Sequence, residues 1–282
     1  KPDNMQVTGA YKIRGAYYKI STLTEEERSK GLITASAGNH AQGVACAAHR
    51  LGARAVIVMP TNANPVKLAG VKAFGGQVEL VGTLGSQREG RAAQLVEQEG
   101  MVNVHPYADP YVAAGQGTIG LEIIEDQPAL DAVAVPIGGG GLISGVATAV
   151  KGLAPQVKTI GVEPAGADRY ARSRAAGQPV TLDKVDTIAD GTRTDHATLF
   201  NFEMIQDKVD ELCTADDDHI RQAMVLLMTK AKLMVEPSGA LPVAAALAGR
   251  LPVEKGQKVA FVLSGGNVDP ALAAQLLADV QA

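Results

Sequence analysis

The chain has 282 residues, of which 46% are hydrophobic, and it carries a net charge of −4. This size allows a sizeable core in about two domains or lobes, and the lack of a basic block argues against nucleic acid or an acidic membrane surface as a partner. No apolar run approaches the ~20 residues of a membrane span, and no signal peptide is recognisable. Cys46 and Cys213 do not make a disulfide framework, so a cytoplasmic location is expected.

The first predicted helix carries a lysine in its first turn. The helix is expected to begin near Ala10 and to run to about Ser21, which places Lys12 close to its N-terminus. There the positive end of the helix dipole lowers the proton affinity of an amine. Such a lysine can act as a nucleophile or a base, although most lysines in a first turn simply extend into water.

A candidate anion site lies where a short strand at 32–35 runs into the loop 36–40 and then into a helix. Ser36, Asn39 and the N–H groups of the helix start could hold a carboxylate or a ring hydroxyl. An ordinary N-cap, in which Asn39 satisfies backbone donors, explains the spacing equally well. His40 could be a base, but a histidine in a first turn more often packs or hydrogen-bonds locally.

Strands and helices then alternate as they do in a parallel sheet that is covered on both faces. Strands are expected at 55–59, 77–81 and 101–104. Two prolines, Pro106 and Pro110, break the rhythm and indicate a crossover between lobes.

The glycine tract 138–141 is entered by an apolar strand at 132–135 and left by a helix at 142–153. Four adjacent glycines cost much backbone entropy on ordering, which is explained if bare backbone must approach a phosphate at a helix N-terminus. A flexible surface turn is the alternative. The tract matches neither G-x-G-x-x-G nor a P-loop, so the phosphate is expected to belong to neither a dinucleotide nor ATP bound in the usual way.

Three further features lie in the second half of the chain. The loop 163–168 begins with Glu163 and ends with Asp168. This pair of carboxylates, with the carbonyl groups between them, could bind a hard cation, or the loop could be an ordinary solvated one. Glu236 follows an apolar run, where a carboxylate is either desolvated or paired with a lysine. The last strand, 258–263, ends at Ser264 in a third glycine-rich exit. Because ligands of open α/β sheets bind beyond the carboxyl ends of the strands, these polar strand exits are expected to share one edge.

The rest of the second half is less regular. The residues 173–208 are polar and give no clear pattern, but 187–192 is expected to form a tight turn near the site. A long helix is expected to follow Asp218 and to reach Lys232, and a last helix is expected over 270–280.

Six motifs follow one another across nearly the whole chain. They are YKIRGA at 11–16, SAGNHAQG at 36–43, GQGT at 115–118, GGGG at 138–141, EPSG at 236–239 and LSGGN at 263–267. Together they resemble the motifs of serine/threonine dehydratases and serine racemases, which are pyridoxal-phosphate enzymes of fold type II, the tryptophan synthase β-like fold. The resemblance implies an α/β chain of two lobes, each an open and largely parallel sheet flanked by helices.

The resemblance also implies the domain organisation. Residues 1–30 and 109–282 would form a large cofactor-binding lobe, and residues 31–108 a small mobile lobe. Roughly forty residues that usually precede Lys1 are not in this sequence, and no C-terminal regulatory domain is expected. The resemblance further implies a homodimer that acts on a small amino-acid substrate.

The resemblance assigns a role to each matching position. Lys12 would hold pyridoxal 5'-phosphate as a Schiff base and then act as the base at Cα. The phosphate would lie against the backbone of Gly138, Gly139, Gly140, Gly141 and Leu142. The ring and its imine would be contacted by Tyr11, Asn39, Glu236 and Ser264. The substrate carboxylate would be held by Ser36, Ala37, Gly38 and His40.

The implied reaction is β-elimination from L-threonine, L-serine or a similar β-hydroxy amino acid, which gives a 2-oxo acid and ammonia. A hydroxyl such as that of Ser264, facing the pyridine nitrogen, need not keep it protonated, so the ring is a weaker electron sink. That favours loss of a β-leaving group. The alternatives are a serine or aspartate racemase, a hydroxyaspartate-type dehydratase, or a catalytically silent ligand-binding relative, against which the retained Lys12 argues.

Two positions depart from the family pattern. Racemases have a serine at the position of Ala37, and alanine carries no proton for the opposite face of Cα, so elimination is expected rather than racemisation. The divalent-cation loop of the family would match Glu163 and the Ala167 carbonyl. Its second carboxylate position holds Arg169, which argues against a Mg²⁺ or Ca²⁺ site, with Asp168 as a partial substitute.

Overall fold

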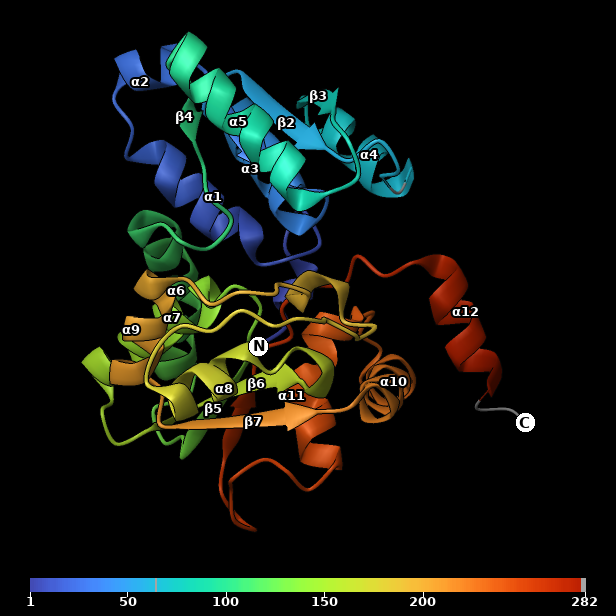
Figure 1. Cartoon of the computed structure of the whole chain (residues 1–282). Helices are drawn as coiled ribbons and strands as arrows, with labels where there is room; N and C mark the ends of the chain where they lie inside the picture. The colour runs from blue at the N-terminus through green and yellow to red at the C-terminus, as the bar shows by residue number, and fades with distance from the viewer. Residues whose placement is uncertain (64, 280–282) are drawn as a thin grey trace. The chain divides into compact units, whose positions relative to one another are not determined.

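The computed structural model describes residues 1–63 and 65–279, which form two compact units (Figure 1). One unit comprises Gln6–Gly115, and the other comprises Lys1–Met5 with the described residues from Gln116 onward. These boundaries differ from those of the expected lobes, because residues 6–30 and 109–115 group with the first sheet. Movement of residues 31–108 as a small lobe stays a prediction.

The unit Gln6–Gly115 is built on a four-stranded parallel sheet in the order β3-β2-β1-β4. Every residue of β2 is buried, as expected for a parallel strand with both faces covered. The strands are β1 (Leu32–Ala35), β2 (Ala55–Met59), β3 (Gln77–Leu80) and β4 (Val102–Asn103). The helices are α1 (Lys12–Ser21), α2 (Glu25–Ser29), α3 (Asn39–Arg50), α4 (Pro65–Ala73), α5 (Gly85–Glu99) and the start of α6 (Pro110–Asp126).

Helix α1 belongs to this unit because it packs directly against α3. A Cβ atom at Gly43 would lie 3.1 Å from the Lys12 carbonyl carbon, so the two backbones touch where α3 carries no side chain. His40, Cys46 and Ala47, which lie three or four residues from Gly43 and so on the same side of α3, are buried too. The close approach fixes the backbone of Lys12 relative to the helix that begins at Asn39.

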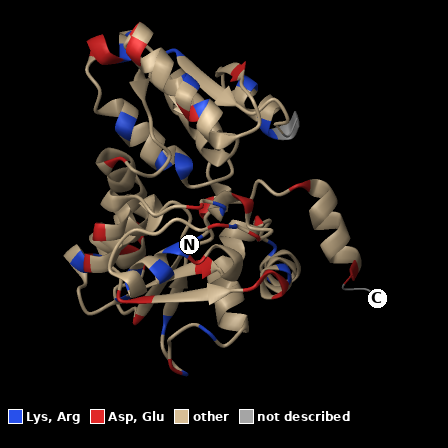
Figure 2. Ribbon diagram, viewed as in Figure 1, with Lys and Arg blue, Asp and Glu red and all other residues tan. Residues whose placement is uncertain are grey.

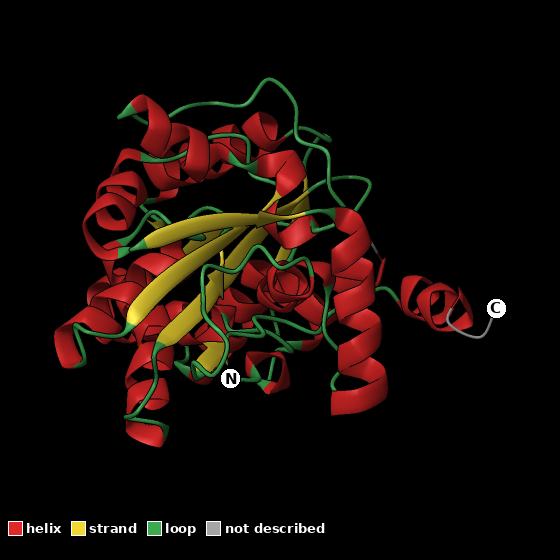
Figure 3. Cartoon of the chain, turned by 90° about the horizontal axis from the view of Figure 1, so that it is seen from below, coloured by secondary structure: helices red, strands yellow, loops and turns green. Residues whose placement is uncertain are grey.

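The other unit is built on a second four-stranded parallel sheet, in the order β7-β6-β5-β8. Figure 3 shows helices on both sides of its strands, and β5 is buried along its whole length. The strands are β5 (Ala132–Pro136), β6 (Lys158–Pro164), β7 (Glu211–Ala215) and β8 (Val259–Phe261). The helices are α7 (Gly141–Leu153), α8 (Arg169–Ala176), α9 (Leu199–Lys208), α10 (Asp217–Leu226), α11 (Pro237–Leu247) and α12 (Pro270–Asp279), and the short helical turns are η1 (Asp3–Met5), η2 (Ala165–Ala167), η3 (Asp190–Thr192) and η4 (Leu227–Ala231).

One expectation for the second half was wrong in detail, and one strand was missed. The long helix expected to reach Lys232 ends as an α-helix at Leu226 and continues as a π-helical turn, η4, after which Lys232 has a left-handed backbone. Strand β7, which carries Cys213, was not predicted, since its residues form no long apolar run. The last helix is described to Asp279, and its expected end at Val280 lies outside the described residues.

Two further features of the described residues are the character of their helices and the distribution of their charges. None of the helices in 1–63 and 65–279 combines the length and apolar character that a bilayer crossing requires. Lysine and arginine residues are interspersed with aspartate and glutamate residues along the elements of both units (Figure 2).

Candidate active site

In the second unit, the carboxyl ends of the strands bring together segments that are far apart in the sequence. Strands β5 and β8 are neighbours, with Ala134 beside Phe261. The glycine tract begins four residues after Ala134, and Ser264 lies three residues after Phe261. Parallel strands end at the same edge, so these two exits lie at one edge of the sheet, as expected. The expectation that the exit at 36–39 shares this edge was wrong, because that loop follows β1, which belongs to the other sheet.

The glycine tract forms a tight turn that leaves no room for side chains. Gly140 has a φ of +96°, a left-handed conformation that favours glycine. A Cβ atom there would lie 2.7 Å from the Tyr170 hydroxyl oxygen and 2.8 Å from the Asn201 Cβ. A Cβ atom at Gly138 would lie 3.0 Å from the carbonyl oxygen of Gly191. The tract is therefore a packed turn rather than a flexible surface loop.

Side chains from two helices hold the carbonyl groups of this turn. The carbonyl oxygen of Gly139 accepts hydrogen bonds from the Tyr170 hydroxyl and from Asn201 Nδ2, each at 2.8 Å. The Gly138 carbonyl accepts from the Arg169 guanidinium. Ser144 of α7 donates to Asn201 Oδ1 at 3.2 Å, which fixes the amide orientation of Asn201.

The direction of these carbonyl groups determines where the N–H groups of the turn point. In a planar trans peptide, the C=O and N–H groups point in opposite directions. Since the Gly138 and Gly139 oxygens are held by α8 and α9, the N–H groups of Gly139 and Gly140 point away from these helices. In the part of the chain that the structure describes, no protein acceptor binds these N–H groups or that of Gly141. Together with the start of α7 they form a nest that suits a phosphate.

Glu236 and Ser264 lie at the same edge and are nearly buried. Glu236 precedes α11, and its backbone N–H donates to the Gly265 carbonyl at 2.9 Å. A Cβ atom at Gly239 would lie 2.7 Å from that same carbonyl oxygen, so the start of α11 packs against the exit of β8. The structure therefore brings the predicted residues Gly138–Gly141, Glu236 and Ser264 to one end of the second sheet.

The expected turn at 187–192 also lies at this edge, and sequence analysis missed the residue that holds it. Asp217 accepts a hydrogen bond from the Thr187 hydroxyl at 2.6 Å and from the Ile188 N–H at 3.0 Å. An acidic residue at a helix start is explained by the helix dipole alone, so nothing in the pattern distinguished Asp217 from its neighbours. Tyr170 and Asn201 were missed for a similar reason, because they lie in helices with no recognisable motif.

The unit Gln6–Gly115 holds the other group of predicted residues. Lys12 is the first residue of α1, and its Nζ donates to the Pro106 carbonyl at 2.6 Å. The same Nζ lies 5.2 Å from the centre of the Tyr11 ring. These contacts place the amine of Lys12 beside the segment that leaves β4, within the unit that also contains Asn39.

The loop after β1 has the form expected of an N-terminal anion site. The Ser36 hydroxyl accepts a hydrogen bond from the Gly38 N–H at 3.3 Å, and α3 begins at Asn39. Gly38, the N-cap residue, contributes no side-chain cap to α3. Ala37 adds only a methyl group to this loop, which leaves Ser36 and the backbone as its polar groups before Asn39.

The His40 side chain is buried and hydrogen-bonded within the unit. Its Nε2 lies 2.8 Å from the Val104 carbonyl, which also accepts from the Thr34 hydroxyl at 2.9 Å. Burial lowers the pKa of His40 to about 3, with the charge of Lys12 acting in the same direction and the Val104 hydrogen bond opposing it. A neutral imidazole whose Nε2 contacts a carbonyl is a structural group, so the local-packing alternative explains the His40 ring better than a role as a base.

Comparison with known proteins identifies the family. Residues 1–265 match the family model described as "Pyridoxal-phosphate dependent enzyme". The chain belongs to this family.

Individual relatives place the chain within the serine/threonine dehydratase and serine racemase group, as its motifs predicted. An L-threonine ammonia-lyase of Thermotoga maritima is 46% identical over 269 residues, which cover 95% of this chain and 67% of the relative. The catabolic L-threonine dehydratase TdcB of Escherichia coli K12 is 40% identical over the full chain and 86% of its own length. The structure of maize serine racemase matches with a TM-score of 0.93 and 40% identity, over 99% of this chain and 86% of the other. The match confirms fold type II.

The geometry of this family member fits its cofactor. The turn has no room for a Cβ atom at Gly140, and the N–H groups of Gly139 and Gly140 point away from helices α8 and α9. Such a turn can accept the phosphate of pyridoxal phosphate. A hydroxyl and a carboxylate, from Ser264 and Glu236, lie at the same sheet edge. These residue types suit the ring nitrogen and the imine of the cofactor.

The loop after β6 does not fit a divalent cation. Glu163 and the Ala167 carbonyl are present, but the Arg169 guanidinium donates to that carbonyl at 2.9 Å and lies 3.8 Å from Glu163 Oε1. Asp168, the expected partial substitute, instead accepts from Arg172 at 2.8 Å. Within the described residues no cluster of three or more His, Cys, Asp or Glu side chains could hold a metal ion.

Glu163 has other partners in this family member. Its two carboxylate oxygens accept hydrogen bonds from the N–H groups of Tyr170, at 3.0 Å, and Ala171, at 2.9 Å. Burial raises the pKa of Glu163 to about 7, while the Arg169 cation and the two N–H donors oppose that rise. The carboxylate therefore supports the first turn of α8.

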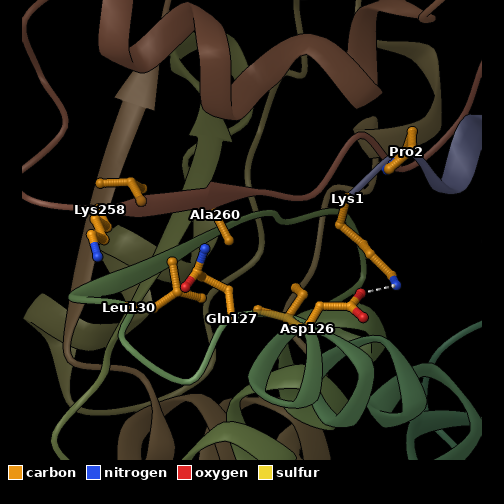
Figure 4. A pocket seen from close by; sticks show the side chains of 9 residues that line it. Lys1, Pro2, Asp126, Gln127, Leu130, Lys258 and Ala260 are labelled. Atoms are coloured by element: carbon orange, nitrogen blue, oxygen red, sulfur yellow. Dashed lines mark ion pairs between the residues drawn. The ribbon is translucent and has the colours of Figure 1, made fainter.

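A hollow at the other end of the same sheet is a different feature (Figure 4). It is bordered by the beginnings of the strands rather than by their ends, so the rule for open α/β sheets argues against it as the active site. The Lys1 side chain forms ion pairs there with Glu122 at 2.7 Å and Asp126 at 3.5 Å. The lining residues are Lys1, Pro2, Ile123, Asp126, Gln127, Leu130, Lys258, Val259 and Ala260.

Proposed function

We propose that this chain catalyses pyridoxal-phosphate dependent elimination from L-threonine or L-serine. The β-hydroxyl leaves as water, and hydrolysis of the remaining enamine gives a 2-oxo acid and ammonia. The observation that carries the proposal is the phosphate nest at 138–141 beside Ser264, in a chain 40–46% identical to proteins named L-threonine ammonia-lyase and L-threonine dehydratase.

The bound cofactor would supply an electron sink for the negative charge left at Cα when its proton is removed. The backbone of Gly138, Gly139, Gly140, Gly141 and Leu142 would hold its phosphate. Asn39, Tyr11, Glu236 and Ser264 would surround the ring and its imine. The hydroxyl of Ser264 does not carry a formal negative charge, so it would not enforce protonation of the ring nitrogen as an aspartate does.

Lys12 is the proposed catalytic residue. Its amine would hold the cofactor through the aldehyde carbon and, once the substrate has replaced it, remove the proton from Cα. The contact between Lys12 Nζ and the Pro106 carbonyl, at 2.6 Å, supports this role because it restrains a long and otherwise mobile side chain. The packing of Gly43 against the Lys12 backbone restrains the other end of the same residue.

The loop 36–40 would bind the substrate carboxylate. The Ser36 hydroxyl and the N–H groups of Gly38, Asn39 and His40 lie at the start of α3, where an anion is stabilised. Ala37 belongs to the same loop but has no group that can transfer a proton. That is the reason to favour elimination over racemisation.

A second candidate function is serine racemisation, which the 40% identity to maize serine racemase favours. Purified protein supplied with L-serine and L-threonine separates the two functions. We expect pyruvate and 2-oxobutanoate to form, with D-serine as a minor product. D-serine as the main product would refute the argument from Ala37.

A Lys12→Ala variant is the matched control for that experiment. Lysine-bound pyridoxal phosphate absorbs in the violet, so the wild type should show this band and the variant should not. Wild-type protein that remains colourless in the presence of the cofactor would contradict the proposed function. We also propose a cytoplasmic location and a homodimeric assembly, which fractionation and light scattering would test.

A further inference from the structure

Arg169 is fully buried, although a charged side chain is rarely buried unless it is paired. It is the first residue of α8, which follows β6 after the short turn η2, and β6 is the neighbour of β5. This position lets its guanidinium reach the exit of β5, where the glycine tract begins. The Arg169 side chain therefore connects the segment that follows β6 with the segment that follows β5.

The partners of the guanidinium are oxygen atoms from four segments of the chain. Nη1 donates to the Ala167 carbonyl at 2.9 Å and to the Thr192 carbonyl at 3.4 Å. Nη2 donates to the Gly138 carbonyl, and Nη1 lies 3.8 Å from Glu163 Oε1. A carboxylate and several backbone carbonyls are the ligand types that a hard divalent cation takes.

We propose that Arg169 is a built-in cation, which takes the place of a divalent metal ion and positions the glycine tract for the cofactor phosphate. A guanidinium is permanently charged and presents its donors in a planar fork. It can therefore serve several oxygen acceptors at once, which a metal ion at the same oxygens would do through coordination. A divalent cation bound there in addition would be repelled by the charge of Arg169.

The positioning effect follows from the carbonyl that Arg169 holds. By binding the Gly138 oxygen, Arg169 turns the N–H of Gly139 away from α8. Tyr170, the next residue, does the same for the following peptide through the Gly139 oxygen. Two consecutive residues of α8 thus orient two consecutive peptides of the phosphate nest. The inference rests on the proposed binding of the cofactor phosphate by this turn.

The binding of pyridoxal phosphate to the apoprotein, followed by absorbance, tests the positioning role. We expect R169A to weaken cofactor binding at least tenfold, and R169K, which keeps the charge but not the fork, to recover part of the loss. Arg172, three residues further along the same helix, is largely exposed and pairs with Asp168. R172A is therefore the matched control, with an expected change below twofold.

Treatment with a chelator tests the replacement of a metal ion. Wild-type protein treated with EDTA should keep its cofactor affinity and its activity within twofold, and R169D should gain binding of Mn²⁺, measured by electron paramagnetic resonance. Activity that EDTA removes and Mg²⁺ restores in the wild type would overturn the inference. If R169D does not fold, the chelator experiment on the wild type and the cofactor affinity of R169K still test the inference.

The outcomes separate this inference from the proposed function. Wild-type protein that binds no pyridoxal phosphate contradicts the proposed function itself. Wild-type, R169A and R169K proteins that are folded by circular dichroism and bind the cofactor with the same affinity contradict only the role of Arg169.

Discussion

Gly140→Ala is the substitution that tests the phosphate nest most directly. A methyl group at this position would lie 2.7 Å from the Tyr170 hydroxyl oxygen and 2.8 Å from the Asn201 Cβ, at a φ of +96°. Backbone strain at such a φ costs about 1–3 kcal/mol, and overpacking against two buried groups costs about 1–3 kcal/mol more. The sum is about 2–6 kcal/mol. This cost can lower the free energy of unfolding, or it can be relieved by displacement of the turn.

Two measurements on the same variant separate these effects. At about 2–4 °C per kcal/mol for a unit of this size, thermal unfolding of the apoprotein should shift down by at least about 4 °C. If the strain is instead relieved by movement of the turn, the Tyr170 and Asn201 hydrogen bonds to Gly139 are lost and the N–H groups rotate. Pyridoxal phosphate binding should then weaken by about tenfold or more, since each 1.4 kcal/mol is a factor of ten.

Gly152→Ala is the matched control. Gly152 lies in α7, the helix that follows the tract, and a Cβ atom there meets nothing within 4 Å. Alanine should therefore stabilise this helix by about 0.5–1 kcal/mol and leave cofactor binding unchanged. If Gly140→Ala behaves like Gly152→Ala in both measurements, the interpretation of the tract as a packed phosphate nest is wrong.

Three further predictions concern single residues. Asn201→Leu should weaken cofactor binding about tenfold, because it removes one of the two donors to Gly139; equal affinity of the variant and the wild type in an absorbance titration would refute this. Ala37→Ser should raise the yield of D-serine from L-serine by at least tenfold relative to pyruvate, and an unchanged product ratio would count against a proton-donor role for this position. His40 has a folded-state pKa near 3 against 6.5 when unfolded, so its contribution to stability should be complete above pH 6.5 and fall by up to about 1.4 kcal/mol per pH unit below it. Urea unfolding at pH 5 and 7.5 should therefore show a smaller pH dependence in His40→Asn than in the wild type, and equal pH dependence would contradict the assignment.

The fold could be predicted where the pattern is local and repetitive. The buried runs at 55–59 and 132–135 are β2 and β5, because a parallel strand covered on both faces needs a continuous apolar run. Strand β7 could not be predicted in this way, since it has exposed and half-buried residues and lies at the edge of its sheet. The π-helical turn at 227–231 was also missed, because its residues follow the apolar spacing of an ordinary helix.

The site could be predicted in part for the same reason. Glycine tracts and strand exits are visible in a sequence, since they are properties of consecutive residues. Tyr170 and Asn201 bind one carbonyl of the tract, yet they lie 31 and 62 residues from Gly139. No local pattern marks such residues, because their role depends on the order of the strands and not on their neighbours in the chain.

Arg169 illustrates how the fold decides between two interpretations of one motif. In the sequence, Glu163, the Ala167 carbonyl and Arg169 look like a cation loop that has lost its second carboxylate. In the structure, the arginine is buried among the same oxygens and also reaches Gly138. An uncharged residue at position 169 would have left the buried oxygen atoms around it without a cation, and burying unpaired polar groups costs folding free energy. Arg169 supplies the positive charge from the chain itself. Because β6 is the neighbour of β5, this charge lies beside the turn that is proposed to bind phosphate.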